Sequence, residues 1–171
     1  MLDKALGLPD QMSEAWKLAD ALSECMPAAS GTLVICGMGG SAIGGQLLCD
    51  LIAEDSKTSV HVERGYTLPA FVGKNTPVVC VSHSGNTEEV LGCFDDGLER
   101  GSPLAVITSG GILMERAEKA GIPLLRIPGG IPPRAALGYL FTPLLKLASC
   151  WGFCEIADEE FGSVLRKTRK L

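Results

Sequence analysis

Aromatic residues are scarce in this 171-residue sequence: they make up 5% of the chain, although hydrophobic residues make up 46%. A core with so few rings must be built from Ala, Val, Ile and Leu, as in buried parallel sheets. An excess of basic residues is also missing, because 15 Lys and Arg against 20 Asp and Glu give a net charge of -5. Such a charge repels a phosphate backbone, so we expect an α/β fold without nucleic-acid partners.

The sequence also lacks an uninterrupted apolar run long enough to cross a membrane. Segment 135–153 is apolar but is broken by Pro143, Lys146 and Ser149, which predicts a buried core helix and no membrane partner. The N-terminus has no basic region followed by an apolar stretch, so a cytoplasmic protein is expected. No cluster of His, Cys or carboxylate residues has metal-ligand spacing, and we expect neither a metal nor another cofactor.

Seven cysteines are an odd number, and they lack the spacing of a disulfide framework. Four of them lie inside apolar runs: Cys36, Cys49, Cys80 and Cys93. We therefore interpret these as reduced thiols that serve as small core residues.

Short apolar runs alternate with helical patterns along the chain, as in βαβ units. The expected strands are Thr32–Cys36, Ser59–Glu63, Pro77–Ser82, Leu104–Thr108 and Pro123–Ile127. With crossover helices they predict a doubly wound five-stranded parallel sheet with flanking helices, preceded by an amphipathic helix over about 10–26. Ligands bind such sheets at the carboxyl ends of the strands, where the direction of the connections switches.

A glycine-rich motif, residues 37–45, follows the first strand with the sequence GMGGSAIGG. Its glycines would let backbone N–H groups approach an anion at a helix N-terminus. The motif alone leaves several alternatives open. It partly fits a dinucleotide fingerprint, with Glu63 as the ribose-binding acid, and it also fits a tight strand-to-helix turn without a ligand.

The loop after the third strand carries three hydroxyl residues, Ser82, Ser84 and Thr87, around a predicted first helical turn. We expect Asn86 to cap that helix, with Glu89 at the capping-box position. A phosphate would find both hydrogen-bond donors and the positive end of the helix dipole there. A dinucleotide fold needs no second hydroxyl cradle, whereas a phosphomonoester held between two loops uses it fully.

With these motifs the chain resembles the sugar isomerase (SIS) domains, and in particular the N-terminal domain of the bifunctional phosphoglucose/phosphomannose isomerases. The matching segments are residues 37–45, 82–89, 108–111 and 132–139, which read GMGGSAIGG, SHSGNTEE, TSGG and PPRAALGY. The resemblance implies a flavodoxin-like three-layer fold and an aldose–ketose isomerase acting on glucose 6-phosphate, mannose 6-phosphate and fructose 6-phosphate.

The resemblance also implies roles for individual residues. The residues that would contact the sugar phosphate are Gly40 and Ser41 in the first loop and Ser82, Ser84 and Thr87 in the second. Arg134 would be the catalytic residue that stabilises the enediolate intermediate, because a fixed guanidinium can offset oxyanion charge. Two prolines precede Arg134 and predict a helix start at that point. His83 occupies a position where the family often has tyrosine, and extended backbone would turn its side chain away from Ser82 and Ser84.

Members of that family are about twice as long, with a second similar domain that supplies the proton-transfer base. We therefore expect residues 1–153 to form a SIS sugar-phosphate-binding domain, and residues 154–171 to form a C-terminal helix leading towards an absent second domain. Glu155, Glu159 and Glu160 match no family motif, and none is assigned as the base. Without a base the chain should be inactive alone, and exposed apolar surface predicts a homodimer.

Three functions remain open from the sequence. The first is the sugar-phosphate-binding half of an aldose–ketose isomerase, as a truncation, a fragment or one partner of a split enzyme. The second is a free-standing SIS module that binds a sugar phosphate and signals to a partner. The third is a dinucleotide-binding domain, which rests on the glycines and Glu63.

Overall fold

Five parallel strands form the centre of the computed structural model, which describes residues 7–23, 31–53 and 58–169. The strands are β1 (Thr32–Cys36), β2 (Ser59–Glu63), β3 (Val78–Ser82), β4 (Leu104–Thr108) and β5 (Leu124–Arg126). Their order is β2-β1-β3-β4-β5, which is the flavodoxin-like order of a doubly wound sheet. The predicted fold class is therefore confirmed, with the third and fifth strands slightly shorter than expected.

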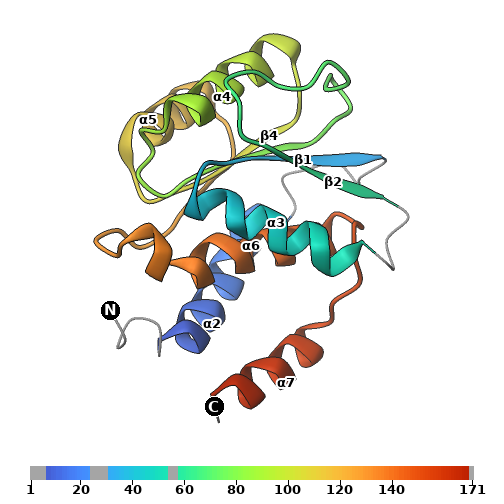
Figure 1. Ribbon diagram of the computed structural model, residues 1–171, viewed down its shortest axis with the longest axis vertical. Coiled ribbons are helices and arrows are strands. Elements are labelled where there is room, and N and C mark those ends of the chain that lie inside the picture. The colour runs from blue at the N-terminus through green and yellow to red at the C-terminus, as the bar shows by residue number, and fades with distance from the viewer. Residues whose placement is uncertain (1–6, 24–30, 54–57, 170–171) are drawn as a thin grey trace.

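Helices cover both faces of the sheet (Figure 1). The helices on one face are α4 (Glu88–Arg100) and α5 (Gly111–Ala120), and those on the other are α3 (Gly40–Ile52) and α6 (Leu137–Cys150). Beyond α6 lie α2 (Leu8–Leu18) and α7 (Asp158–Thr168), and the 3-10 turn η1 (Ala19–Leu22) contacts both α6 and β5. The predicted first helix over about 10–26 is thus a shorter α-helix followed by a 3-10 turn, and residues 24–26 lie outside the described ranges.

Alternation along each strand divides the core into two clusters. On β1, Leu33 and Ile35 pack with residues of α3 and α6, whereas Val34 and Cys36 pack with residues of α4 and α5. Successive side chains of a strand point to opposite faces, so a strand covered on both sides must be apolar throughout. This explains the continuous apolar runs in the sequence and the small number of aromatic residues.

Helix α6 is almost entirely buried, as predicted for this apolar segment. Its charged residue, Lys146, is 8% exposed. The ammonium group lies 2.6 Å from a carboxylate oxygen of Asp20 and 3.6 Å from one of Asp158, and it sits 4.8 Å from the centre of the Trp16 ring. These contacts tie α6 to η1, α2 and α7. No helix in the described parts of the chain is both long enough and apolar enough to cross a membrane.

The described cysteines are free, in agreement with the sequence prediction. Cys36, Cys80 and Cys93 are buried in the core, and the neighbouring Cys80 thiol raises the pKa of Cys36 well above its usual value. Cys49 is only partly buried, and its thiol donates to the carbonyl of Val60 at 3.4 Å. The three buried thiols serve as small core residues, whereas Cys49 lies at the edge of the core.

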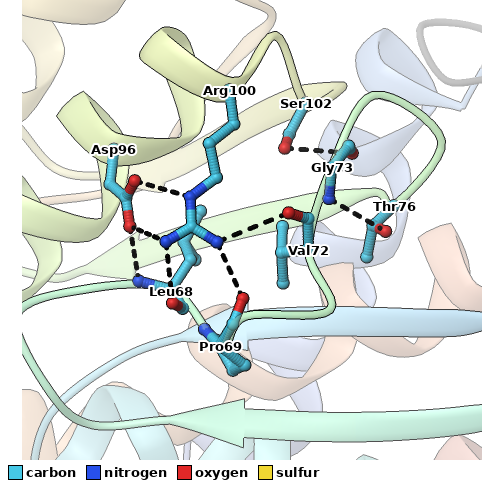
Figure 2. A network of polar contacts seen from close by, with 8 residues as sticks. All are labelled: Leu68, Pro69, Val72, Gly73, Thr76, Asp96, Arg100 and Ser102. Atoms are coloured by element: carbon cyan, nitrogen blue, oxygen red, sulfur yellow. Dashed lines mark hydrogen bonds and ion pairs between the residues drawn. The ribbon is translucent and has the colours of Figure 1, made fainter.

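A long connection without a helix, residues 64–77, joins β2 to β3 and is held against α4 by Arg100 (Figure 2). The guanidinium pairs with Asp96, with Nε to Oδ1 and Nη2 to Oδ2 distances of 2.7 Å. It also donates to the carbonyls of Leu68 at 3.0 Å and Pro69 at 2.8 Å. One side chain therefore satisfies several backbone acceptors that have no sheet or helix partner.

Replacing Arg100 with methionine should lower the free energy of unfolding by about 2–3 kcal/mol. The variant leaves the loop carbonyls without their charged donor and leaves the partly buried Asp96 unpaired. The matched control is Arg116→Met, because Arg116 pairs with Asp95 on the surface and should contribute less than about 1 kcal/mol. Urea titrations of both variants would measure the difference, and equal losses would contradict the assignment.

Candidate functional site

Four segments of the chain come together where the strands end. They are the loop before α3, the loop after β3, the loop after β4 and the 3-10 turn η2 (Pro133–Ala135). Successive connections change direction between β1 and β3, which lie side by side at the centre of the sheet. Doubly wound sheets bind ligands at the carboxyl edge of such a switch point. The predicted site residues lie on these segments or at the ends of the elements that they join: Gly40 and Ser41 open α3, Ser82 ends β3, Ser84 and Thr87 follow β3, and Arg134 lies in η2.

The first loop leads directly into α3, which starts at Gly40. No described side chain caps this helix, so the backbone N–H groups of its first turn and its dipole are directed at the loop edge. Ser41 lies in that first turn and is 5% exposed. This arrangement provides donors for an anion, as the glycine-rich motif predicts.

The second loop places two of the three predicted hydroxyls in contact. The Ser82 and Thr87 oxygens lie 2.9 Å apart, and the backbone N–H of Gly85 donates to the Ser82 hydroxyl at 3.1 Å. Ser82 is 1% exposed, whereas Ser84 lies on the outside of the loop and accepts from the N–H of Asn86 at 3.2 Å. Ser82 therefore shapes the turn from within, and Thr87 and Ser84 are the more accessible hydroxyls.

The backbone of His83 connects three of the loops. Its N–H donates to the Ser41 hydroxyl at 3.3 Å, and its carbonyl accepts the Ser109 hydroxyl at 2.6 Å and the Ser109 N–H at 3.2 Å. The side chain is buried, and this burial lowers the pKa of His83, which keeps the ring neutral. Ser109 was given no role from the sequence, although its place directly after β4 is a signal that it lies at this edge.

The second and third loops pack so closely that a side chain at Gly85 has no space. A Cβ atom at this position would lie 1.7 Å from the carbonyl oxygen of Gly110, and Gly85 has a φ of +71°. The carbonyl of Gly85 in turn accepts the N–H of Leu113 at 2.9 Å, inside α5. Glycine here fixes the distance between the two loops.

The predicted cap of α4 is wrong. Helix α4 begins at Glu88 with Thr87 at the N-cap position, and no described side chain caps it. The side chain of Asn86 instead accepts the N–H of Ile112 at 3.1 Å, in the first turn of α5. The contact between the neighbouring loops brings the α5 N-terminus within reach of Asn86, and this partner lies 26 residues away in the sequence. Local spacing could not reveal it.

Arg134 is exposed and lies in η2, three residues before α6 begins. The two prolines therefore start a 3-10 turn and not the predicted α-helix. The turn lies against the first loop, since a Cβ atom at Gly40 would be 3.5 Å from Pro133. Arg134 makes no ion pair with the part of the chain that the structure describes. The turn that carries the predicted arginine thus neighbours the first loop in the fold.

Glu63, the alternative ribose-binding acid, is engaged by its own loop. One carboxylate oxygen accepts the N–H groups of Gly65 at 2.6 Å and Arg64 at 2.9 Å, and the other lies 3.4 Å from His61 Nε2. Burial alone would raise the pKa of Glu63, but these hydrogen bonds outweigh it and hold the pKa below its usual value. A dinucleotide ribose would have to displace these hydrogen bonds.

Within the described ranges, no group of three or more His, Cys, Asp or Glu residues fits a metal ion.

No protein-family model matches the chain. The structure is similar to the tagatose-6-phosphate ketose/aldose isomerase of Escherichia coli, with a TM-score of 0.72 over 98% of this chain and 51% of that one, at 13% identity. In sequence, the chain is 41% identical over 167 residues to the bifunctional phosphoglucose/phosphomannose isomerase of Caldicellulosiruptor bescii. The alignment covers 97% of this chain and 49% of the relative. The chain has the fold of a SIS domain.

This SIS domain spans about half the length of the curated relatives that it matches. A further relative, the D-glucosamine-6-phosphate 4-epimerase of Sulfolobus acidocaldarius, is 39% identical over 139 residues, which cover 78% of this chain and 44% of the epimerase. Both relatives are named for reactions of phosphorylated hexoses. What the two activities share is therefore the phosphosugar, while the reaction differs.

Proposed function

We propose that this SIS domain is the sugar-phosphate-binding N-terminal half of an aldose–ketose isomerase that interconverts glucose 6-phosphate or mannose 6-phosphate with fructose 6-phosphate. The observation that carries the proposal is the meeting of the start of α3 with the second and third loops, joined through the backbone of His83, at a sheet edge where no described side chain caps α3 or α4. Relatives named for phosphoglucose and phosphomannose isomerisation support the substrate class.

In this proposal the phosphate lies in the second loop, against the hydroxyls of Ser82, Ser84 and Thr87. Gly40 and Ser41 contact the sugar phosphate from the first loop, where the uncapped end of α3 offers further N–H groups. Two carboxylates stand in the first turn of α4, on the exposed Glu88 and the partly buried Glu89. Glu89 lies beside Tyr66, and its charge raises the pKa of that phenol.

Arg134 acts at the other end of the substrate. Moving a proton between adjacent carbons of an open-chain sugar develops oxyanion charge, which the guanidinium offsets through paired N–H donors. No residue of this chain is assigned as the base, and a positioned base is worth roughly 10²–10⁴-fold in rate. We therefore expect binding without appreciable turnover by the chain alone.

Isothermal titration of the purified chain with fructose 6-phosphate tests the proposal, with a coupled isomerase assay on the same sample. We expect saturable binding and a rate near background. Binding accompanied by rapid turnover would show that the base is present after all. Binding of NAD but not fructose 6-phosphate would support the dinucleotide alternative and contradict the proposal.

The free-standing SIS module remains the second candidate, because it shares the same binding site. The two functions separate when the chain is mixed with a folded second domain. A half-enzyme should gain isomerase activity, whereas a sensor should bind the sugar phosphate and stay inactive. The division into residues 1–153 and a C-terminal helix leading to a second domain belongs to the first candidate, as does the proposed cytoplasmic location.

The homodimer also belongs to this proposal, and the outer face of α3 supports it. Ile43, Leu47 and Leu51 are 50%, 39% and 56% exposed and recur every four residues, so they form one apolar stripe along the helix. The stripe carries no charge, which suits a second copy of a chain whose net charge is -5. We propose that two copies pack their α3 stripes against each other.

Leu47→Glu should therefore convert the dimer to a monomer, because it places two like charges in the apolar contact. The matched control is Leu98→Glu on α4, since Leu98 is also 39% exposed but lies outside the stripe. Sedimentation equilibrium of both variants gives the mass directly. A monomeric wild-type chain, or a Leu47→Glu variant that remains dimeric, would contradict the proposed interface.

A further inference from the structure

Helix α2 holds the segment that carries Arg134. The side-chain amide of Gln11 donates to the carbonyl of Ala135 at 2.8 Å, across 124 positions of the sequence. Gln11 is 7% exposed, so this contact lies inside the molecule. A buried amide is costly unless it is hydrogen-bonded, and its partner here is the peptide directly after Arg134.

The Ala135 carbonyl needs such a donor because α6 does not supply one at this point. The N–H groups of Tyr139 and Leu140 both donate to the carbonyl of Ala136, at 3.0 and 3.1 Å. The first hydrogen bonds of α6 thus use the carbonyl of Ala136, the residue after Ala135, as their acceptor. The Gln11 amide takes the place of a helical donor and fixes the end of η2.

A second tie lies one turn along the same helix. The hydroxyl of Tyr139 donates to Glu14 at 2.6 Å, and burial together with the Glu14 carboxylate raises the pKa of Tyr139 to about 12. Between the two ties the helices are in close contact, since a Cβ atom at Gly138 would lie 2.6 Å from the Gln11 Cβ. The segment that carries Arg134 therefore cannot shift along α2 without breaking both hydrogen bonds.

We propose that Gln11 is a positioning residue, which sets the place of the Arg134 guanidinium relative to the first loop by holding the Ala135 carbonyl. The inference rests on the proposed function, because it gives Arg134 a ligand to meet. Pro133 links Arg134 to the first loop: it precedes Arg134 in η2 and lies 3.5 Å from a Cβ position at Gly40. A loosened η2 would move the guanidinium away from the bound sugar, even though Gln11 itself touches no ligand.

A double-mutant cycle tests this inference. The variants are Gln11→Met, which keeps the volume and removes the donor, Arg134→Ala and the combination of both. The probe is arabinonate 5-phosphate, whose planar carboxylate resembles an enediolate, and titration calorimetry measures its affinity. We expect Gln11→Met to weaken binding about fivefold when Arg134 is present, and less than about twofold when it is absent.

The control variant is Ser102→Ala. Ser102 is also buried and also donates to a backbone carbonyl, that of Gly73 at 3.1 Å, but it precedes β4 at the opposite edge of the sheet. It should lose stability and keep wild-type affinity. If Gln11→Met does not fold, Tyr139→Phe removes the second tie and enters the same cycle with the same expected pattern.

The outcomes separate the inference from the function on which it rests. Equal weakening of binding with and without Arg134, or no weakening at all, would overturn the positioning role and leave the proposed function standing. A wild-type chain that binds neither fructose 6-phosphate nor arabinonate 5-phosphate would overturn the proposed function, and the inference with it.

Discussion

Gly85→Ala is expected to destroy sugar-phosphate binding and to lower the free energy of unfolding by about 3 kcal/mol or more. The new Cβ atom would lie 1.7 Å from the Gly110 carbonyl oxygen, so the second and third loops must separate. The backbone adds to this cost, because a φ of +71° is unfavourable for alanine. Separation also pulls apart the Ser82 turn and the contacts that join the loops through His83. Chemical denaturation and titration with fructose 6-phosphate measure the two effects.

Gly73→Ala is the matched control for this substitution. Gly73 also lies in a loop, but apart from its chain neighbours no atom of the described residues lies within 4 Å of its Cβ position, and its φ is not positive. A Gly-to-Ala change at such a position reduces the entropy of the unfolded chain and stabilises by roughly 0.4–1 kcal/mol. The two glycines should thus give changes of opposite sign. A Gly85→Ala variant with wild-type stability and affinity would show that the loops are not packed as described.

The sheet could be predicted from the sequence because strands buried on both faces leave a strong local signal. Val34 and Ile35 illustrate this. They are adjacent in the chain but pack into opposite core clusters, so apolar residues are needed on both faces of the strand. The position proposed for the site follows from the same reasoning, because the carboxyl ends of parallel strands meet at one edge. Glycines and hydroxyls after β1 and β3 were enough to indicate it.

The contacts that position the site residues could not be predicted in this way. Asn86 is a residue type that often caps helices and lies just before α4, yet its side chain accepts the N–H of Ile112 in the next helix. The partner of Gln11 is Ala135, at the other end of the chain. Both contacts depend on how separate elements pack, and side-chain spacing within one element carries no information about them. Two prolines before Arg134 likewise predict a turn of helix but not its 3-10 form.

Arg134→Ala should weaken the binding of arabinonate 5-phosphate about 10–100-fold and that of fructose 6-phosphate by less than about tenfold. If the Arg134 guanidinium stabilises the enediolate, it faces a full negative charge in the carboxylate of arabinonate 5-phosphate. The corresponding end of fructose 6-phosphate is uncharged. Because Arg134 is exposed, the change in unfolding free energy should stay within about 0.5 kcal/mol. Arg134→Lys keeps the positive charge but loses the planar pair of N–H donors, so its affinity for arabinonate 5-phosphate should lie between those of the wild type and the alanine variant.

The control for charge alone is Arg166→Ala, which removes one positive charge from the exposed surface of α7. It should leave both affinities unchanged, since exposed charges more than a Debye length from a ligand are largely screened. The ratio of the two affinities then locates the arginine along the substrate. Equal losses for both ligands would place Arg134 at the phosphate, which they share, and would contradict a role at the enediolate. A loss confined to the carboxylate analogue would place it where the proton moves.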